Sequence, residues 1–304
     1  MNVLELNNVS KSFGSLNVLQ GLSFSVPQSS VFGFIGKNGA GKTTTMKMIL
    51  GFLPVSAGKI SVCGEPITFG ATRTNRHIGY LPDVPEFYGY MRPKEYLKLC
   101  GQVIGLNSDE VTRQTGDLLA LVGLDGVNRK ISGFSRGMKQ RLGIAQALIG
   151  EPRLLICDEP TSALDPIGRR EILDILHQIK CRTTIVFSTH ILSDVERICD
   201  TIGILDKGHL ALQGRLEEIR NTYRQDGVRV ELANAGDMAH ISQRLAALSG
   251  VDNIKTAGNT VTVRLHTAEN GAKVLEAVAA THVPVIRYEI LEPVLEDVFL
   301  EVTQ

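Results

Sequence analysis

An α/β fold built on a parallel sheet is predicted by three stretches of this 304-residue sequence. The first is a glycine-rich loop, 36–43, between an apolar run and a helix-like run. The other two are apolar runs, 154–157 and 184–187, that end in polar side chains. A strand that is apolar throughout is typical of a parallel sheet covered on both faces, and ligands bind beyond the carboxyl ends of such strands. We therefore expect the loop and both strand ends to meet at one edge of the sheet.

The glycine-rich loop has the pattern G-x-x-x-x-G-K-[ST] of a phosphate-binding loop. Its residues are Gly36, Lys37, Asn38, Gly39, Ala40, Gly41, Lys42 and Thr43, and Thr44 follows in the helix. The glycines let backbone N–H groups surround an anion, the helix N-terminus adds its positive dipole, and Lys42 reaches the β- and γ-phosphates. Thr43 is expected to offer its hydroxyl to Mg²⁺. A dinucleotide-binding G-x-G-x-x-G is excluded, because Thr44 stands where its third glycine would be, and this argues against a dehydrogenase.

Carboxylates follow the first apolar strand, and a histidine follows the second. Asp158 and Glu159 come directly after 154–157, and His190 comes soon after 184–187. We expect Asp158 to hold Mg²⁺, directly or through water. Glu159 is the candidate general base for an attacking water, and His190 is a candidate hydrogen-bond partner of a γ-phosphate. An acid pair at a strand end is commonly solvated surface, and a lone histidine is commonly structural. Here both occur in a chain that also has a phosphate-binding loop, and this combination favours function.

A mostly helical insert separates the phosphate loop from these strand ends. Helices are predicted over 93–104 and 108–122, the second with Ser108 as its N-cap. A third helix begins near Ser135, where Ser135 and Gly137 form a second anion-binding surface through the same N–H and dipole physics. A plain serine N-cap is the competing interpretation.

Two further candidates lie on predicted loops. Asp83 is in the exposed part of the loop after the strand 78–81, where two prolines exclude a regular helix. Phe13 lies in a turn between predicted strands 3–9 and 18–26. An aromatic ring just upstream of a phosphate loop could stack on a nucleobase, and a core position is the competing interpretation.

The C-terminal part predicts a second, smaller domain. Between 227 and 290 the pattern predicts strand, helix, strand, strand, helix and strand, with a hairpin turn at Gly258-Asn259. This order is typical of a ferredoxin-like α+β domain, and a last helix is predicted over 293–302. The part carries no motif for phosphate, metal or nucleophilic chemistry, so we expect an accessory or dimer-contact role.

Composition limits the classes of function. Lys and Arg together equal Asp and Glu at 32 each, so the charge gives no reason to propose a nucleic-acid ligand. The five cysteines include no C-x-x-C pair, which indicates a reducing compartment and no zinc site. The N-terminus lacks the pattern of a signal peptide, and no apolar run is long enough to span a bilayer. We expect neither secretion nor a membrane span.

In this order, the motifs resemble the nucleotide-binding subunit of an ABC transporter over residues 1–214. GKNGAGKT resembles the Walker A loop, LLICDEP the Walker B strand and FSRGMKQR the ABC signature. The signature is the most diagnostic motif, because other phosphate-loop ATPases lack it. Ser162-Ala163-Leu164-Asp165 resembles the D-loop, and His190 resembles the switch histidine.

The resemblance implies a phosphate-loop NTPase fold of ABC type. Its parts would be a mixed sheet core, an antiparallel β subdomain and a helical subdomain over about 85–150. A linker, 215–226, and the accessory domain, 227–304, would follow.

The resemblance also implies a composite nucleotide site. Two copies would sandwich two ATP molecules, each held by the loop 36–43 of one copy and by Ser135, Gly137 and Met138 of the other. Asp165 of the D-loop joins the expected nucleotide-binding residues.

Three features of the sequence bear on which branch of the family it resembles and on where it departs from the family's usual residues. Phe13 occupies the family's adenine-stacking position, where tyrosine is commoner. Asp83 stands where the family usually has the Q-loop glutamine; it can bind Mg²⁺ through an oxygen but has no amide donor. The signature has FSRGM where LSGGQ is the norm, and this version, with LEDVFL at 295–300, resembles the branch that exports drugs, lantibiotics and bacitracin-like peptides.

The function implied is an ATPase subunit that uses ATP and Mg²⁺ to power transport, in the direction of export, through separate transmembrane permease subunits. Its place would be peripheral, at the cytoplasmic face of the cell membrane. A soluble ABC ATPase acting on ribosomes or DNA is the alternative, but such proteins generally carry two nucleotide-binding units or a long coiled-coil insert. A regulator that does not hydrolyse ATP would need an altered Glu159 or His190, and both are present.

Overall fold

The chain folds into two compact units. The computed structural model describes residues 1–71, 73–223, 227–267, 269–291 and 295–303. Unit 1 is Met1–Leu216 with Val302–Gln304, and unit 2 is Glu217–Glu301. Helix α7, Leu216–Thr222, lies within the predicted linker 215–226, of which residues 224–226 are outside the described part.

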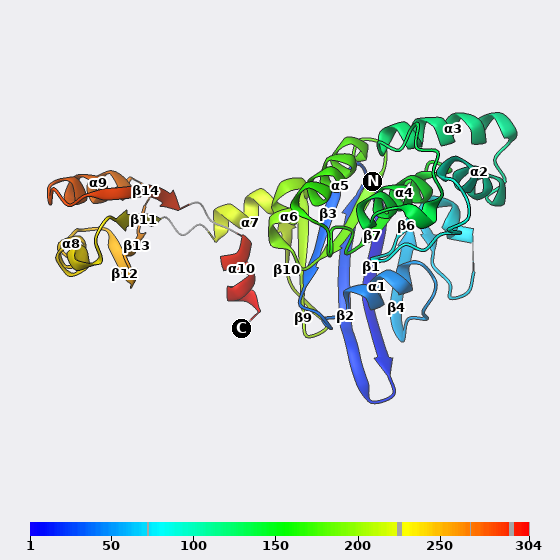
Figure 1. Ribbon diagram of the computed structural model, residues 1–304. Coiled ribbons are helices and arrows are strands. Elements are labelled where there is room, and N and C mark those ends of the chain that lie inside the picture. Colours follow the sequence, from blue (N-terminus) through cyan, green and yellow to red (C-terminus); the bar gives the residue numbers. More distant parts are fainter. Residues whose placement is uncertain (72, 224–226, 268, 292–294, 304) are drawn as a thin grey trace. The chain divides into compact units, whose positions relative to one another are not determined.

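Unit 1 is built on a six-stranded sheet in the order β10-β9-β3-β8-β7-β6. All neighbouring pairs are parallel except β9 with β10, so the sheet is mixed (Figure 1). Its strands are β3 (Val31–Gly36), β6 (Ile78–Leu81), β7 (Leu154–Asp158), β8 (Thr184–Thr189), β9 (Thr201–Asp206) and β10 (His209–Arg215). Every residue of β3, β7 and β8 is buried, which confirms the prediction from the apolar runs.

A second, antiparallel sheet of unit 1 has the order β2-β1-β4-β5. Its strands are β1 (Asn2–Phe13), β2 (Leu16–Pro27), β4 (Ala57–Val62) and β5 (Glu65–Pro66). The ring of Phe24 stacks on Phe32 with centroids 5.0 Å apart and on Phe34 at 5.5 Å. These three rings join β2 to β3, so the antiparallel sheet shares its core with the central one.

Six helices of unit 1 complete the α/β arrangement. They are α1 (Lys42–Ile49), α2 (Pro93–Val103), α3 (Ser108–Leu121), α4 (Arg136–Leu148), α5 (Pro166–Ile179) and α6 (Leu192–Ile198), with short 3₁₀ turns at Arg73–His77 and Ile131–Gly133. The helical insert is therefore confirmed, but its predicted Ser108 cap is wrong. Asn107 caps α3 instead, because its side-chain oxygen accepts hydrogen bonds from the N–H groups of Asp109 at 3.1 Å and Glu110 at 2.9 Å.

Unit 2 has the predicted order of strand, helix, strand, strand, helix and strand. Its elements are β11 (Gly227–Leu232), α8 (Met238–Ala246), β12 (Val251–Ala257), β13 (Thr260–Leu265), α9 (Asn270–Ala279) and β14 (Val285–Leu291), with a 3₁₀ turn at Ala235–Asp237 and a last helix, α10 (Leu295–Val302). The sheet order is β12-β13-β11-β14, antiparallel throughout. Both α8 and α9 pack on one face of it (Figure 1). This is the ferredoxin-like topology that the sequence predicts.

None of the helices in the described part of the chain is both long enough and apolar enough to cross a membrane.

Candidate functional site

The phosphate-binding loop connects β3 to α1 through backbone geometry that requires glycine. Gly41 has φ 112°, and a Cβ there would lie 2.7 Å from the Leu19 side chain of β2. Gly36 packs so closely on β9 that a Cβ would meet the carbonyl oxygen of Leu205 at 2.7 Å. At the crest of the loop, the N–H of Ala40 donates to the carbonyl of Lys37 at 3.1 Å. The glycines therefore form a tight turn whose exposed crest, residues 37–39, stands at the start of a helix.

Lys42 is buried at the base of this loop. Its ammonium donates a hydrogen bond to the carbonyl oxygen of Gly36 at 2.7 Å and lies 3.4 Å from Glu159 Oε1. Thr43, the next residue, is exposed on the first turn of α1, and Thr44 is half-buried beside it. The loop thus holds its cation in place through contacts with its own backbone and with the end of β7.

Asp158, the last residue of β7, connects three elements. Its Oδ2 accepts a hydrogen bond from the Thr43 hydroxyl at 3.0 Å, and its Oδ1 accepts one from the Ser188 hydroxyl at 3.0 Å. Burial raises the pKa of Asp158, and the two hydrogen bonds oppose that rise. A hydroxyl and a carboxylate side by side are the oxygen ligands that Mg²⁺ takes from a protein when phosphates provide others. Thr43 and Asp158 therefore fit this ion.

Glu159 and His190 face each other across the ends of β7 and β8. His190 Nδ1 lies 2.9 Å from Glu159 Oε2, while Glu159 Oε1 lies 3.4 Å from Lys42. Glu159 has the positive φ of 48°, which is strained for a residue with a side chain, and its N–H donates to the carbonyl of Ser188 at 2.9 Å. The backbone of β8 thus helps to hold a carboxylate between a lysine and a histidine.

The loop after Glu159 is fixed by a buried aspartate of α6. Asp194, whose side chain is 3% exposed, accepts a hydrogen bond from the Thr161 hydroxyl at 2.7 Å and pairs with Nε of Arg169 at 2.6 Å. Thr161 lies two residues after Glu159, and Asp194 lies four residues after His190. Asp194 therefore connects the segments that follow the two candidate catalytic side chains.

The predicted second anion surface lies at the start of α4. Ser135 is the N-cap, and its hydroxyl accepts a hydrogen bond from the Met138 N–H at 3.2 Å. Gly137 faces open space, since no heavy atom lies within 4 Å of the place where its Cβ would be. The serine does cap the helix, and the open glycine beside it leaves room for a ligand to approach the first turn.

Asp83 lies next to the helix α4. Its carboxylate pairs with Arg136 at 3.4 Å, and its carbonyl oxygen accepts a hydrogen bond from Gln140 at 3.4 Å. Both contacts are to α4, the helix that begins at the signature. The described structure therefore connects Asp83 with the signature helix and gives it no contact with Thr43 or Asp158.

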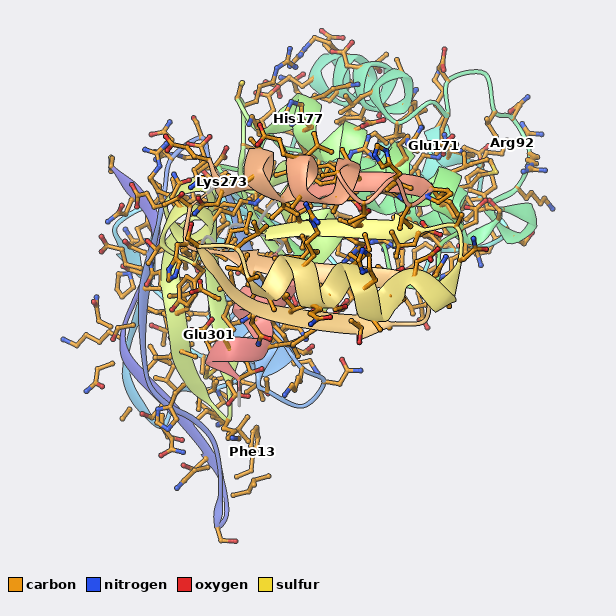
Figure 2. All side chains as sticks on the ribbon, turned by 90° about the vertical axis from the view of Figure 1, so that its left-hand side faces the viewer. Phe13, Arg92, Glu171, His177, Lys273 and Glu301 are labelled. Carbon is orange, nitrogen blue, oxygen red and sulfur yellow. The ribbon has the colours of Figure 1, made fainter. Side chains whose placement is uncertain are left out.

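Two other candidates lie apart from the strand ends. Phe13 is at the tip of the β1–β2 hairpin, 47% exposed, with the ammonium of Lys11 4.7 Å from its ring centroid (Figure 2). The competing core interpretation is wrong, and Phe13 ends a strand instead of lying in a loop. Asp165 is the N-cap of α5 and accepts a hydrogen bond from the Gly168 N–H at 3.0 Å.

Sequence reasoning missed the residues that support the candidate catalytic side chains through contacts with them or with the segments that follow them. Ser188, Thr161, Asp194 and Arg169 all contact residues or segments of the site. A signal existed for Ser188, because a polar residue at the end of an apolar strand faces the neighbouring strand end when both run parallel. The aspartate of α6 gave no signal, because only the packing of α5 against α6 shows that it is buried.

Comparisons with known proteins agree with the fold. A family model described as ABC transporter matches residues 19–162, and one described as ATP-binding protein DrrA1-3-like, C-terminal domain, matches residues 214–303. The chain is 31% identical to the linearmycin resistance ATP-binding protein LnrL of Bacillus subtilis (strain 168), over 99% of this chain and 98% of that protein. It is 39% identical to the bacitracin transport ATP-binding protein BcrA of Bacillus licheniformis, over 71% of this chain and 69% of that one.

A solved structure, described as the ATP binding subunit of an ABC transporter, is also similar. It covers 73% of this chain and 93% of its own with a TM-score of 0.66 and 34% identity. The chain therefore belongs to the ABC transporter family, as an ATP-binding subunit with ATPase activity.

Proposed function

We propose that this subunit hydrolyses ATP in a nucleotide-sandwich dimer and powers export through separate membrane-spanning permease subunits. The observation that carries the proposal is the position of Glu159, between Lys42 and His190 at the carboxyl edge of the sheet. ATP binding itself follows from the family. The catalytic roles below are supported by the geometry of the site.

The phosphate groups of ATP are bound by the loop 36–43. Its backbone N–H groups and the N-terminus of α1 attract the anion, and the buried Lys42 ammonium provides the fixed cation. Mg²⁺ would be held by Thr43 and Asp158, whose side-chain oxygens are 3.0 Å apart, and would neutralise charge on the phosphate oxygens. The exposed ring of Phe13 is the surface on which adenine stacks.

Glu159 accepts the proton of the attacking water. Its carboxylate is directed into the site by its strained backbone and by contacts on both oxygens, with Lys42 and with His190. A carboxylate held in one orientation needs little rearrangement to take the proton. His190, hydrogen-bonded to this base at 2.9 Å, orients it and can reach a γ-phosphate with its exposed edge.

The start of α4 completes the nucleotide site of a second copy. Ser135, Gly137 and Met138 are at or next to the surface, and the first turn of α4 directs N–H groups outward. Asp165 of the D-loop is exposed at the start of α5 and lies at the same dimer contact. The ATP bound by the loop 36–43 already has the N-terminus of α1 beside its phosphates. The N-terminus of α4 is therefore available to the ATP that the partner copy binds.

Export is supported by the relatives. One is named for resistance to linearmycin and another for bacitracin transport, and ATP-binding subunits of this family work with membrane permease components. The ending LEDVFL, residues 295–300, lies in α10 within the part matched by the DrrA1-3-like model. We place the subunit at the cytoplasmic face of the membrane, because ATP is supplied there and the permease brings the subunit to the bilayer.

Glu159→Gln tests the catalytic proposal. The amide keeps the size and hydrogen bonding of the side chain but cannot accept a proton, so turnover should fall by about 10²–10⁴-fold while MgATP binding persists. The variant should remain dimeric with ATP in sedimentation. Glu151→Gln is the control, because Glu151 is an exposed carboxylate paired with Arg113 at 3.3 Å that precedes the start of β7, whereas Glu159 follows the end of that strand. Near-parental turnover in Glu159→Gln would move the base elsewhere, and loss of ATP binding would make Glu159 a structural residue.

Membrane fractionation tests the separate permease. Expressed alone, the chain should remain in the supernatant after membranes are sedimented. Expressed with the reading frame beside its own gene, it should sediment with the membranes if that frame encodes the permease. A chain that distributes identically in both cases would contradict the proposed partner.

A further inference from the structure

The outer side of β14 is a free sheet edge. The sheet order of unit 2 leaves β12 and β14 at the two ends, and β14 pairs through its inner side with β11. Within the described residues no strand pairs with its outer side. An edge strand presents unpaired N–H and C=O groups to any chain that can align with it.

The two edges of this sheet differ in their exposed side chains. On β14, Val285 is 40% exposed, Ile286 62% and Ile290 64%, whereas β12 carries no exposed large apolar residue. Proteins commonly protect edge strands with charges, bulges or covering segments. β14 has two charged residues, Arg287 and Glu289, and a register shift between Val285 and Arg287, but it still exposes three large apolar residues along its seven residues, which favours a partner strand.

The sequence of β14 is complementary to itself. Val285-Ile286-Arg287-Tyr288-Glu289-Ile290-Leu291 has the same kinds of residue at equal distances on both sides of Tyr288, except that the charges are opposite. Antiparallel pairing of two copies about a two-fold axis at Tyr288 places Arg287 opposite the partner's Glu289. It also places Ile290 opposite the partner's Ile286, beside which the register of β14 with β11 shifts. Apolar pairs and opposite charges across antiparallel strands are the pairs that stabilise a sheet.

The two faces of β14 fit this pairing. The Tyr288 hydroxyl donates to the Gly271 carbonyl of α9 at 2.7 Å, so Tyr288 is on the helix-covered face, and strand alternation places Ile290 on that face with it. The register of β14 with β11 shifts between Arg287 and Val285, so the alternation is interrupted at Ile286. Arg287 and Glu289 are on the opposite face, 3.1 Å apart, and Glu289 also lies 3.7 Å from Arg229 of β11. Two-fold pairing would cover Ile290 and give Arg287 and Glu289 one further partner each.

We propose that β14 is a dimer contact between two copies of this chain. Their sheets join edge to edge through main-chain hydrogen bonds, with the side-chain pairs around Tyr288 setting the register. The contact lies in unit 2 and uses no nucleotide-binding residue, so it forms without ATP. It is a different contact from the nucleotide sandwich and stands independently of it.

The test is sedimentation equilibrium of the full chain in EDTA without nucleotide. The parent should associate to a dimer. Arg287→Glu places like charges opposite each other twice in every dimer and should weaken association by about tenfold or more. Arg287→Glu with Glu289→Arg restores opposite charges across the axis and should return the dissociation constant to within about threefold of the parent.

Two controls keep the outcome interpretable. Lys255→Glu reverses a charge on the other edge strand, β12, and should leave association unchanged. The melting temperature of each variant shows whether unit 2 remains folded, and Ile290→Lys is a second way to weaken the same contact. A parent that is monomeric at every concentration would overturn the proposal. So would a double variant that associates as weakly as Arg287→Glu alone.

Discussion

Replacing Asp194 by asparagine would show how strongly the site depends on the contacts that Asp194 of α6 makes with Thr161 and Arg169. The substitution keeps the shape of the side chain and one oxygen that can accept the hydrogen bond of Thr161. It removes the charge that pairs with Arg169 at 2.6 Å and presents an N–H group toward an N–H donor. Thr161 and Asp194 belong to the segments that follow Glu159 and His190, so the loss should affect both stability and catalysis.

The stability change can be estimated from the burial of the two partners. A hydrogen bond to a charged group contributes about 1.5–3 kcal/mol. Asp194 is almost fully buried, but the Arg169 side chain is 30% exposed and regains part of its hydration when the pair is broken. We therefore expect the free energy of unfolding to fall by about 2 kcal/mol, toward the lower end of the range. Looser positioning of Glu159 should lower kcat by about tenfold without changing the KM for ATP.

Asp174→Asn is the matched control. Asp174 also links α5 to α6, through Arg197 at 2.8 Å, but both side chains are exposed, so the change should cost at most about 0.5 kcal/mol. Urea denaturation gives the stability of each variant, and steady-state ATP hydrolysis gives kcat and KM. A parental kcat in Asp194→Asn would refute the positioning role. Equal destabilisation by the two variants would refute the argument from burial.

Three further changes test other parts of the site. Lys42→Ala should remove ATP binding, because it deletes the cation proposed to face the β- and γ-phosphates, and an affinity within about twofold of the parent in a binding titration would contradict this. In the Glu159→Gln background, Gly137→Asp should leave ATP binding intact but remove the ATP-dependent increase in dimer, because it places an anion where the partner's γ-phosphate is proposed to dock. Sedimentation with and without ATP measures it, and an unchanged increase would count against a composite site. Exchanging the charges of Asp83 and Arg136, which are 3.4 Å apart, should retain about twofold more ATPase activity than Arg136→Asp alone, and equal losses would show that the pair is incidental.

The sequence was most informative where a local pattern and the fold require the same residue. Gly41 is an example, because both the motif and the left-handed backbone against Leu19 need a glycine. The buried strands β7 and β8 were likewise predictable, because an apolar run fixes their burial and their parallel direction brings Asp158 and Ser188 together.

Contacts went unpredicted where a side chain's partner comes from a distant segment. Asp83 was expected to bind Mg²⁺ because it stands at the family's Q-loop position, and that role stays a prediction, but its contact with Arg136 of α4 was not foreseen. Asp194 was missed because its sequence neighbours are those of an ordinary short helix. Neither contact has a local period or motif, since the first depends on where α4 lies next to the loop of Asp83 and the second on how α5 packs against α6.

The proposed pairing of β14 would also change how the two nucleotide sites of a sandwich meet. Two copies tethered through this strand would no longer need a collision in solution to form the ATP sandwich. Their sites would meet at an effective concentration of about 1 mM, far above the concentration of most proteins. Turnover per subunit would then be insensitive to dilution in the parent. In Arg287→Glu, where the β14 contact is weakened, turnover per subunit would depend on protein concentration.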